Sequence, residues 1–181
     1  MNHVALFRNL NLGHPGSPTA KQLIDAFGGT AAARNFQTNG TVLLESDDPD
    51  TTARHALQVL RNNRYDQNMV LRPLSELERL VNETPTADPT ENIYRTMISF
   101  YDTDRVPAVK LPLRSRDQLV EIRRLDHRSA GSVTWKPRHT AGNVTSFLEE
   151  LLNVPVTTRT LGTLQRLLTA TVGVDTQRTR T

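Results

Sequence analysis

The chain has 181 residues, of which 36% are hydrophobic, and a mass of 20.3 kDa, which is enough for one domain or two small ones. It contains no cysteine, and this excludes disulfide scaffolds, thiolate metal sites and cysteine nucleophiles. No apolar run approaches the roughly 18 residues that a membrane span needs, and the N-terminal residues lack the basic and apolar regions of a signal peptide. We therefore expect a cytoplasmic globular protein with no membrane partner, either a monomer or a weak homodimer.

Basic and acidic residues are distributed unevenly along the chain. Residues 1–104 carry 9 Lys and Arg against 13 Asp and Glu, whereas residues 105–181 carry 13 against 6. The chain is arginine-rich, since lysine occurs only at Lys21, Lys110 and Lys136. Arginine suits bidentate contact with phosphate. The C-terminal half is therefore expected either to face a polyanion or to be a solvated basic surface.

The chain begins with a predicted strand over residues 4–7, followed by a Gly/Pro loop at 13–16. Ser17 and Pro18 predict a capped helix start, and Gly28-Gly29 predicts its end. Residues 33–37 and 41–44 predict two strands.

An Asn39-Gly40 turn, in which both residues need positive φ, is expected to join these two strands. A second helix is expected from Asp48-Pro49 to Asn62-Asn63, because its apolar residues recur on one face. A strand over 69–71 and a short helix opened by a capping box at 75–78 complete the first half.

The element order β-α-β-β-α-β predicts an α+β, ferredoxin-like first half packed against a second, smaller α+β half. Its strands are apolar at consecutive positions, which predicts that both faces of the sheet are covered. An open sheet with stacking aromatics for RNA is therefore not expected. The predicted boundaries are a first subdomain over 1–83, a linker over 84–93, a second subdomain over 94–174 and a flexible tail over 175–181.

The second half is expected to follow the order β-β-β-α-(β)-α. A strand is predicted over 96–101, an irregular stretch over 103–117, and a hairpin of 119–125 with 132–136 around Ala130-Gly131.

Two helices are predicted after this hairpin. A helix over 144–152 has a possible capping box at Ser146 and Glu149. The last helix, over 161–172, is expected to be capped by Thr160, to bury Val172 with its leucines and to end at Gly173.

No group of residues indicates a reaction. The histidines are scattered, none has a second ligand three or four residues away, and no metal site is expected: His3, His14, His55, His127 and His139. The loop at 13–16 precedes a helix, where an anion can bind, but it has neither a Walker lysine nor a dinucleotide fingerprint. The sequence indicates no cofactor and does not decide whether the protein is an enzyme.

Three segments resemble a bacterial domain-of-unknown-function family, number 1697. Residues 5–13 (ALFRNLNLG) are similar to its opening LLRGINVGG, residues 35–42 (NFQTNGTV) to YIQSGNVV, and residues 154–164 (VPVTTRTLGTL) to VPATTRNWNTV. The resemblance implies an α+β protein with ferredoxin-like halves and implies no activity. Asn9 and His14 occupy positions where the family has glycines.

The polar residues that match the family are candidates for a ligand site. If the two halves pack face to face, they can line one cleft and bind an anion: Arg8, Asn11, Gln37, Thr158 and Arg159, with Thr163 beside them. The alternative is structural, because buried polar side chains also connect strand ends and helix caps.

Two functional hypotheses lead. In the first, the protein is a non-catalytic binding module for a nucleic acid, which it contacts through basic residues of its C-terminal half: Arg114, Arg116, Arg123, Arg124, Arg128, Lys136 and Arg138. In the second, it binds or acts on an anionic small molecule in the cleft. A structural or regulatory role with a protein partner is a third possibility.

Overall fold

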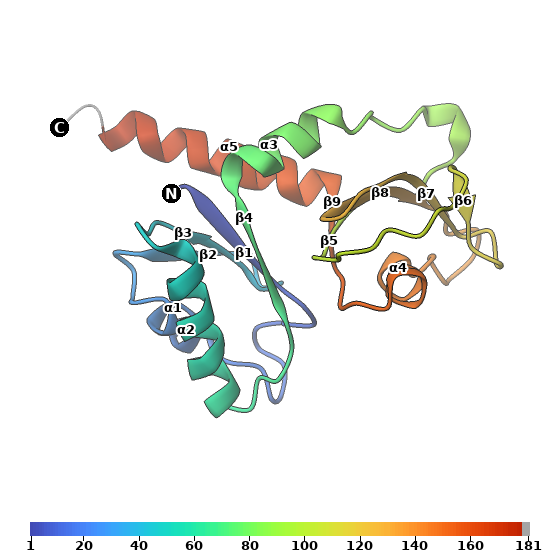
Figure 1. The fold of residues 1–181 in the computed structure, drawn as a ribbon. Helices are drawn as coiled ribbons and strands as arrows, with labels where there is room; N and C mark the ends of the chain where they lie inside the picture. The colour runs from blue at the N-terminus through green and yellow to red at the C-terminus, as the bar shows by residue number, and fades with distance from the viewer. Residues whose placement is uncertain (179–181) are drawn as a thin grey trace. The chain divides into compact units, whose positions relative to one another are not determined.

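The computed structural model describes residues 1–178, with side chains through Thr171. It is a mixed α+β structure with two antiparallel sheets and two compact units (Figure 1). Unit 1 comprises Met1–Glu78 and Leu167–Thr181, and unit 2 comprises Arg79–Arg166. Within the described residues, no helix is both long enough and apolar enough to span a membrane.

Unit 1 contains the β-α-β-β-α-β order that the sequence predicts. Its elements are β1 (His3–Phe7), α1 (Ala20–Ala26), β2 (Ala33–Phe36), β3 (Thr41–Leu44), α2 (Pro49–Asn62), β4 (Met69–Pro73) and the first part of α3 (Leu74–Glu83). The sheet order is β2-β3-β1-β4, with every neighbouring pair antiparallel. β3 therefore separates β1 from β2, as expected of a split β-α-β unit.

The N-termini of α1 and α2 are both capped by side chains. Thr19, not Ser17 as predicted, caps α1, because its hydroxyl accepts from the Gln22 N–H while the Gln22 side chain accepts from the Thr19 N–H. Asp48 caps α2 by accepting from the Thr51 N–H, which confirms the predicted start at Asp48-Pro49.

The turn between β2 and β3 is longer than predicted. Four residues (37–40) connect the strands, and positive φ occurs at Gln37 (+63°) and Gly40 (+66°) rather than at Asn39. The Asn39 side chain instead accepts a hydrogen bond from the Thr41 hydroxyl at 2.9 Å. The predicted hairpin is confirmed, and the predicted two-residue turn is wrong.

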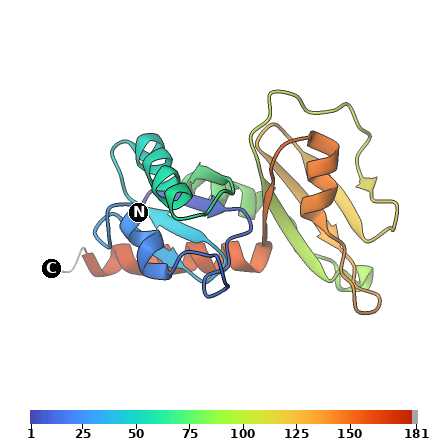
Figure 2. The same ribbon diagram turned by 90° about the horizontal axis from the view of Figure 1, so that it is seen from below.

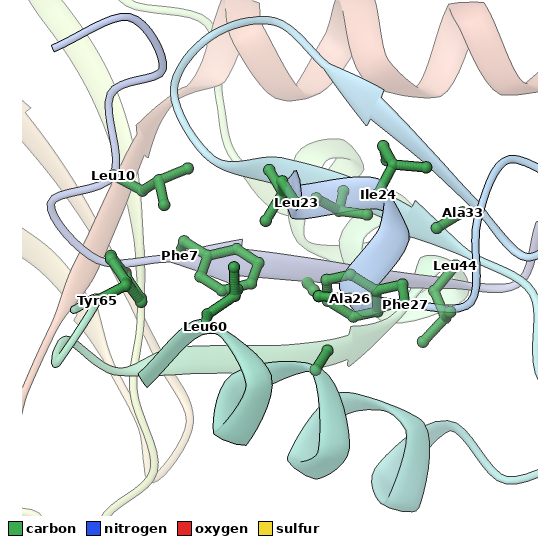
Figure 3. Packing of buried hydrophobic residues seen from close by; sticks show 13 residues of the cluster. Phe7, Leu10, Leu23, Ile24, Ala26, Phe27, Ala33, Leu44, Leu60 and Tyr65 are labelled. Carbon is green, nitrogen blue, oxygen red and sulfur yellow. The ribbon is translucent and has the colours of Figure 1, made fainter. Parts of the chain in front are cut away.

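The core of unit 1 lies between the sheet and the helices α1 and α2. Phe7 packs edge-on against Phe27 and Tyr65, with ring centroids 6.0 and 5.6 Å apart (Figure 3). Val4 and Leu6, which point to the opposite side of β1, are also fully buried. Both faces of this sheet are therefore covered, as its continuous apolar strands predict.

Unit 2 contains a five-stranded antiparallel sheet in the order β6-β7-β8-β5-β9. Its elements are η1 (Pro89–Glu91), β5 (Arg95–Phe100), β6 (Leu113–Arg114), β7 (Val120–Leu125), β8 (Ser129–Thr134), α4 (Val144–Leu152), β9 (Thr157–Thr160) and the start of α5 (Leu161–Arg178). The helix α4 lies across one face of the sheet (Figure 2). Its Leu148 and Leu152 belong to the same buried cluster as Val120 and Ile122 of β7.

The β7–β8 hairpin turns earlier than the sequence predicts. Ala130 and Gly131 lie inside β8, paired with Leu125 and Arg124. The turn is at residues 126–128, because the Asp126 carboxylate accepts from the backbone N–H groups that follow it. A glycine is therefore not the turn residue here.

The last two helices differ from the prediction in the N-cap of α4 and in the end of α5. Asn143 caps α4 by accepting from the Ser146 N–H, so the expected box at Ser146 and Glu149 is wrong. Thr160 caps α5, as predicted, but the helix continues past Gly173 to Arg178. The side chain of Val172 and residues 179–181 of the expected tail lie outside the described part of the chain.

Candidate functional site

Three of the five predicted ligand-binding residues lie at one end of the unit 1 sheet. Arg8 and Asn11 follow β1, and Gln37 begins the turn after β2. The Leu12 N–H donates to the Thr38 carbonyl at 2.8 Å, which joins this loop to this turn. The fold thus brings the two segments together, with Asn11 and Gln37 exposed.

The Arg8 side chain is half-buried and already has a partner inside unit 1. Its Nη1 donates to Gln67 Oε1 at 2.5 Å, and the Tyr65 hydroxyl donates to the Arg8 carbonyl at 2.5 Å. These bonds hold the segment after β1 against the segment before β4. They favour a structural contribution from Arg8.

Thr158 and Arg159 belong to unit 2, on β9. The Thr158 hydroxyl is bonded to those of Ser99 and Thr145 at 2.8 and 2.9 Å. Arg159 is 8% exposed, and its Nη1 donates to the Thr157 hydroxyl and the Thr158 carbonyl. These contacts connect β9 to its neighbours in the same unit.

Two of the predicted nucleic-acid-binding arginines form an ion-pair cluster on β6 and β7. Arg114 Nε and Arg123 Nε lie 2.6 and 2.7 Å from the two carboxylate oxygens of Glu121. Arg123 Nη2 also lies 2.7 Å from a carboxylate oxygen of Glu91, the last residue of η1. We call these four residues the Glu121 cluster.

The geometry of β7 explains how Arg123 reaches two carboxylates. The register with β8 shifts between Ile122 and Arg124, so Arg123 has no partner strand residue there. Burial raises the pKa of Glu121, but the hydrogen bonds from Arg123 and Arg114 outweigh it and the pKa of this carboxyl is lowered. Glu121 is therefore held ionised between two cations.

Two further predicted arginines also have acidic neighbours. Arg124 is bonded to Asp126 and to the Ser129 hydroxyl. Arg128 Nη1 lies 3.8 Å from Asp102, with both side chains exposed. Much of the positive charge of the hairpin is therefore balanced locally.

The remaining three predicted basic residues are exposed. Arg116, Lys136 and Arg138 have no carboxylate partner among the described residues. Unit 2 as a whole has 13 Lys and Arg against 10 Asp and Glu, a smaller excess than the C-terminal half of the sequence suggests. Among the predicted contact residues, those without a carboxylate partner in the described chain therefore lie after β8 (Lys136 and Arg138) and in the loop after β6 (Arg116).

Tyr94 and Trp135, which the sequence analysis did not single out, lie beside Lys136, and we call these two residues the aromatic cluster. Tyr94 is exposed, with the Arg95 guanidinium 4.7 Å and the Lys136 ammonium 5.2 Å from its ring centroid. The Tyr94 N–H donates to the Thr134 carbonyl at 2.8 Å, which places Tyr94 next to Trp135. Two cations are thus held against one exposed ring.

A hollow of about 600 Å³ opens between these aromatic residues and η1. The residues lining it include Pro89, Ile93, Tyr94, Trp135, Lys136 and Pro137. Its volume is within the range of small-ligand sites. Among the described residues, no three His, Asp or Glu side chains are grouped so that they can hold a metal ion.

The signal for this cluster is present in the sequence as two dipeptides, Tyr94-Arg95 and Trp135-Lys136. Each joins an aromatic to a basic residue, and sites for single-stranded nucleic acids combine these two residue types in space. Because the dipeptides are far apart in the chain, only the pairing of β5 with β8 shows that they are neighbours.

The family model described as "Protein of unknown function (DUF1697)" matches residues 1–130. The chain belongs to the DUF1697 family. No curated protein and no solved structure matches it.

The DUF1697 match covers the described sheet of unit 1 and ends inside β8. Tyr94, Arg114 and Arg123 lie within it, whereas Lys136 and Arg138 lie beyond it. Of the two aromatic residues that line the hollow, Tyr94 therefore lies within the matched range and Trp135 lies after it.

Proposed function

We propose that this protein is a binding module for a nucleic acid, which it contacts through the basic surface of unit 2. The observation that carries the proposal is the exposed Tyr94 ring with the cations of Arg95 and Lys136 against it. Cations bind the phosphate backbone, and an aromatic ring offers a face to a base. Few other classes of ligand need both groups at one place.

The distribution of ion pairs indicates which basic residues contribute most. Lys136 and Arg138 are exposed without a carboxylate partner in the described part of the chain, so a phosphate that binds them displaces no ion pair; Lys136 has only its contact with the Tyr94 ring to give up. Arg114 and Arg123 must first release Glu121 or Glu91. We therefore expect Lys136 and Arg138 to contribute more affinity than the arginines of the hairpin.

The small-molecule alternative has less support. The Arg8 guanidinium donates to Gln67, and the Arg159 guanidinium donates to β9 itself. A ligand that used either group would have to replace hydrogen bonds already formed within its unit.

The test is a fluorescence-anisotropy titration of labelled RNA and DNA oligonucleotides at about 50 and about 200 mM salt. Affinity should fall steeply between the two conditions, because phosphate contacts release counterions. The double variant Lys136→Glu/Arg138→Glu should lose most of the binding.

The matched control is Arg105→Glu/Lys110→Glu, which makes the same charge change at two other exposed positions of unit 2. It should bind nearly as the unmodified protein does. Equal losses in the two double variants would mean general attraction by net charge and would contradict a local site, and salt-independent binding would contradict phosphate contact.

A further inference from the structure

Tyr94 has an unusual position for a large side chain. The Tyr94 side chain is 41% exposed, and among the described residues no other large hydrophobic side chain is as exposed. Its backbone N–H bond to the Thr134 carbonyl continues the pairing of β5 with β8 by one residue, which fixes the backbone of Tyr94 at the start of β5, an interior strand of the sheet. An exposed ring on a rigid backbone loses little conformational entropy when a ligand stacks on it.

The cations near Tyr94 leave its ring accessible to a ligand that brings its own negative charge. The Lys136 ammonium is a compact, strongly hydrated charge on a flexible stem, 5.2 Å from the ring centroid. A phosphate attracts this ammonium more strongly than the ring does, since it carries a full charge. When the ammonium moves to a phosphate, a flat apolar group can take its place.

Trp135, the second aromatic residue of the hollow, is held in place by two contacts. Its Nε1 donates to the Glu91 carbonyl at 3.0 Å, and the Arg114 guanidinium lies 5.1 Å from its ring centroid. The Glu91 carboxylate is in turn bonded to Arg123. Contacts with Glu91 and Arg114 of the Glu121 cluster therefore hold the Trp135 ring in place on one side of the hollow, which Tyr94 also lines.

The charges around the hollow favour an anionic occupant. Lys136 lines the hollow and Arg95 lies against the Tyr94 ring, and neither has a carboxylate partner in the described chain. Arg138 follows Lys136 by two residues and is exposed. Asp88 also lines the hollow and is negative, since the hydrogen bonds from the N–H and the hydroxyl of Thr90 lower its pKa, but one carboxylate faces the two cations of Lys136 and Arg95. A proline-rich or basic peptide would lack a counterpart for the three cations.

We infer that Tyr94 stacks one unpaired base of a single-stranded nucleic acid while Lys136, Arg95 and Arg138 contact the neighbouring phosphates. The hollow of about 600 Å³ then receives the nucleotide between Tyr94 and Trp135. Inside a duplex the base faces are stacked on each other and only the terminal pairs expose a face, so along its length a nucleic acid offers base faces to the ring where it is single-stranded. This inference rests on the proposed function and narrows it from nucleic acid to single strands.

The experiment compares a labelled single-stranded oligonucleotide with a blunt duplex of the same length, titrated by anisotropy. Tyr94→Ala and Tyr94→Leu should each bind the single strand about tenfold more weakly, because one base–aromatic stack is lost. Tyr94→Phe keeps the flat ring and should bind within about twofold of the unmodified protein. The salt dependence should not change, since these substitutions remove no charge.

Duplex binding serves as the internal control. The affinity for the duplex should be lower than that for the single strand, and it should be equal in the unmodified protein and the three Tyr94 variants. Circular dichroism should show that all four proteins are folded. Unchanged single-strand affinity of Tyr94→Ala, or a preference for the duplex, overturns the stacking inference. If Lys136→Glu/Arg138→Glu still weakens binding in that case, the proposed function stands without it, whereas absence of any binding at low salt overturns both.

Discussion

Gly40 is the residue on which the contact between the loop after β1 and the β2–β3 turn depends. Its φ is +66°, and a Cβ built on it would lie 2.7 Å from Leu10 Cδ2 and 2.9 Å from Phe7 Cβ. Its carbonyl accepts from the Phe7 N–H at 2.8 Å, so the backbone cannot move away without breaking this bond. The position requires glycine for two reasons, its left-handed backbone and the close approach of two side chains.

We expect Gly40→Ala to lower the free energy of unfolding by about 3 kcal/mol, as overpacking adds to the backbone cost. Gly13→Ala is the matched control, because Gly13 also has positive φ (+91°) but nothing lies within 4 Å of its Cβ position. It should cost only about 1 kcal/mol. Equal losses in urea unfolding would show that backbone conformation, not close packing, determines the role of Gly40.

For the basic residues of unit 2, residue type predicts where positive charge lies but not which charges are paired. Arginine at positions 114, 123, 124 and 128 predicts positive charge on β6 and on the β7–β8 hairpin. The carboxylates that balance it are Glu121 on the same strand and Glu91, which is 32 residues from Arg123. Charge counts along a sequence cannot show such pairing, because it depends on which segments meet.

At the scale of the elements, the Glu121 cluster connects β6, β7 and η1. Glu121 is 5% exposed and accepts hydrogen bonds from both Arg114 and Arg123. Glu121→Gln should destabilise the protein by about 2 kcal/mol, because charge-assisted bonds are replaced by weaker ones in a buried place. Glu150→Gln, the same change on an exposed face of α4, should have almost no effect in the same thermal unfolding measurement.

The same cluster predicts how stability depends on pH. The pKa of Glu121 is lowered by its arginines despite burial, and the pKa of Asp126 is lowered, also against burial, by the N–H groups of Arg128 and Ser129. A lowered folded-state pKa adds stability that is complete above the ordinary carboxyl range near 4 and is lost as the pH falls through the lowered values.

We therefore expect a nearly constant unfolding midpoint from about pH 7 to about pH 5 and a fall below about pH 4. In Glu121→Gln the fall should be shallower, since one of the responsible carboxylates is gone. An identical slope in the variant and the unmodified protein would show that other groups cause the acid loss.

Among the elements, those with local signals are the ones that the sequence predicted well. Helix starts at Asp48 and Thr160 and the helix stop at Gly28-Gly29 are confirmed, because capping and left-handed glycines involve neighbouring residues. Hairpin turns were less well predicted. In β7–β8 the Asp126 side chain, not the Ala130-Gly131 pair, makes the turn.

At the scale of the whole molecule, α5 belongs to both units. Its residues through Arg166 are part of unit 2, and Leu167 begins the part that belongs to unit 1. Leu164 and Leu167 are both fully buried. Two leucines less than one turn apart are therefore assigned to different units.

We expect Leu167→Ala to cost about 3 kcal/mol and to lower hydrogen-exchange protection mainly in β1 and β3. Leu164→Ala should cost about as much and lower protection mainly in β5 and β8. The same loss pattern in both variants would show that the two units unfold together. A loss below about 1 kcal/mol would show that neither leucine is a core residue.

The candidate site was predicted only in part. Lys136 and Arg138 were expected as basic contacts, and the structure shows them exposed. Tyr94, Arg95 and Trp135 were not predicted, since none belongs to a motif with fixed spacing. They become neighbours because β5 pairs with β8, which aligns Arg95 with Thr134.

The sequence by itself determined the α+β class, the family, the order of the elements in unit 1 and the burial of both sheet faces. The class, the element order and the burial follow from apolar periodicity, caps and turn residues, which act between residues close together in the chain. The family follows from the similarity of whole segments to the family's sequences. Only the tertiary structure decided which cations are balanced and which remain available around Tyr94. That outcome depends on strand register and on contacts such as Arg123–Glu91, where the energy comes from groups that are distant in sequence and adjacent in space.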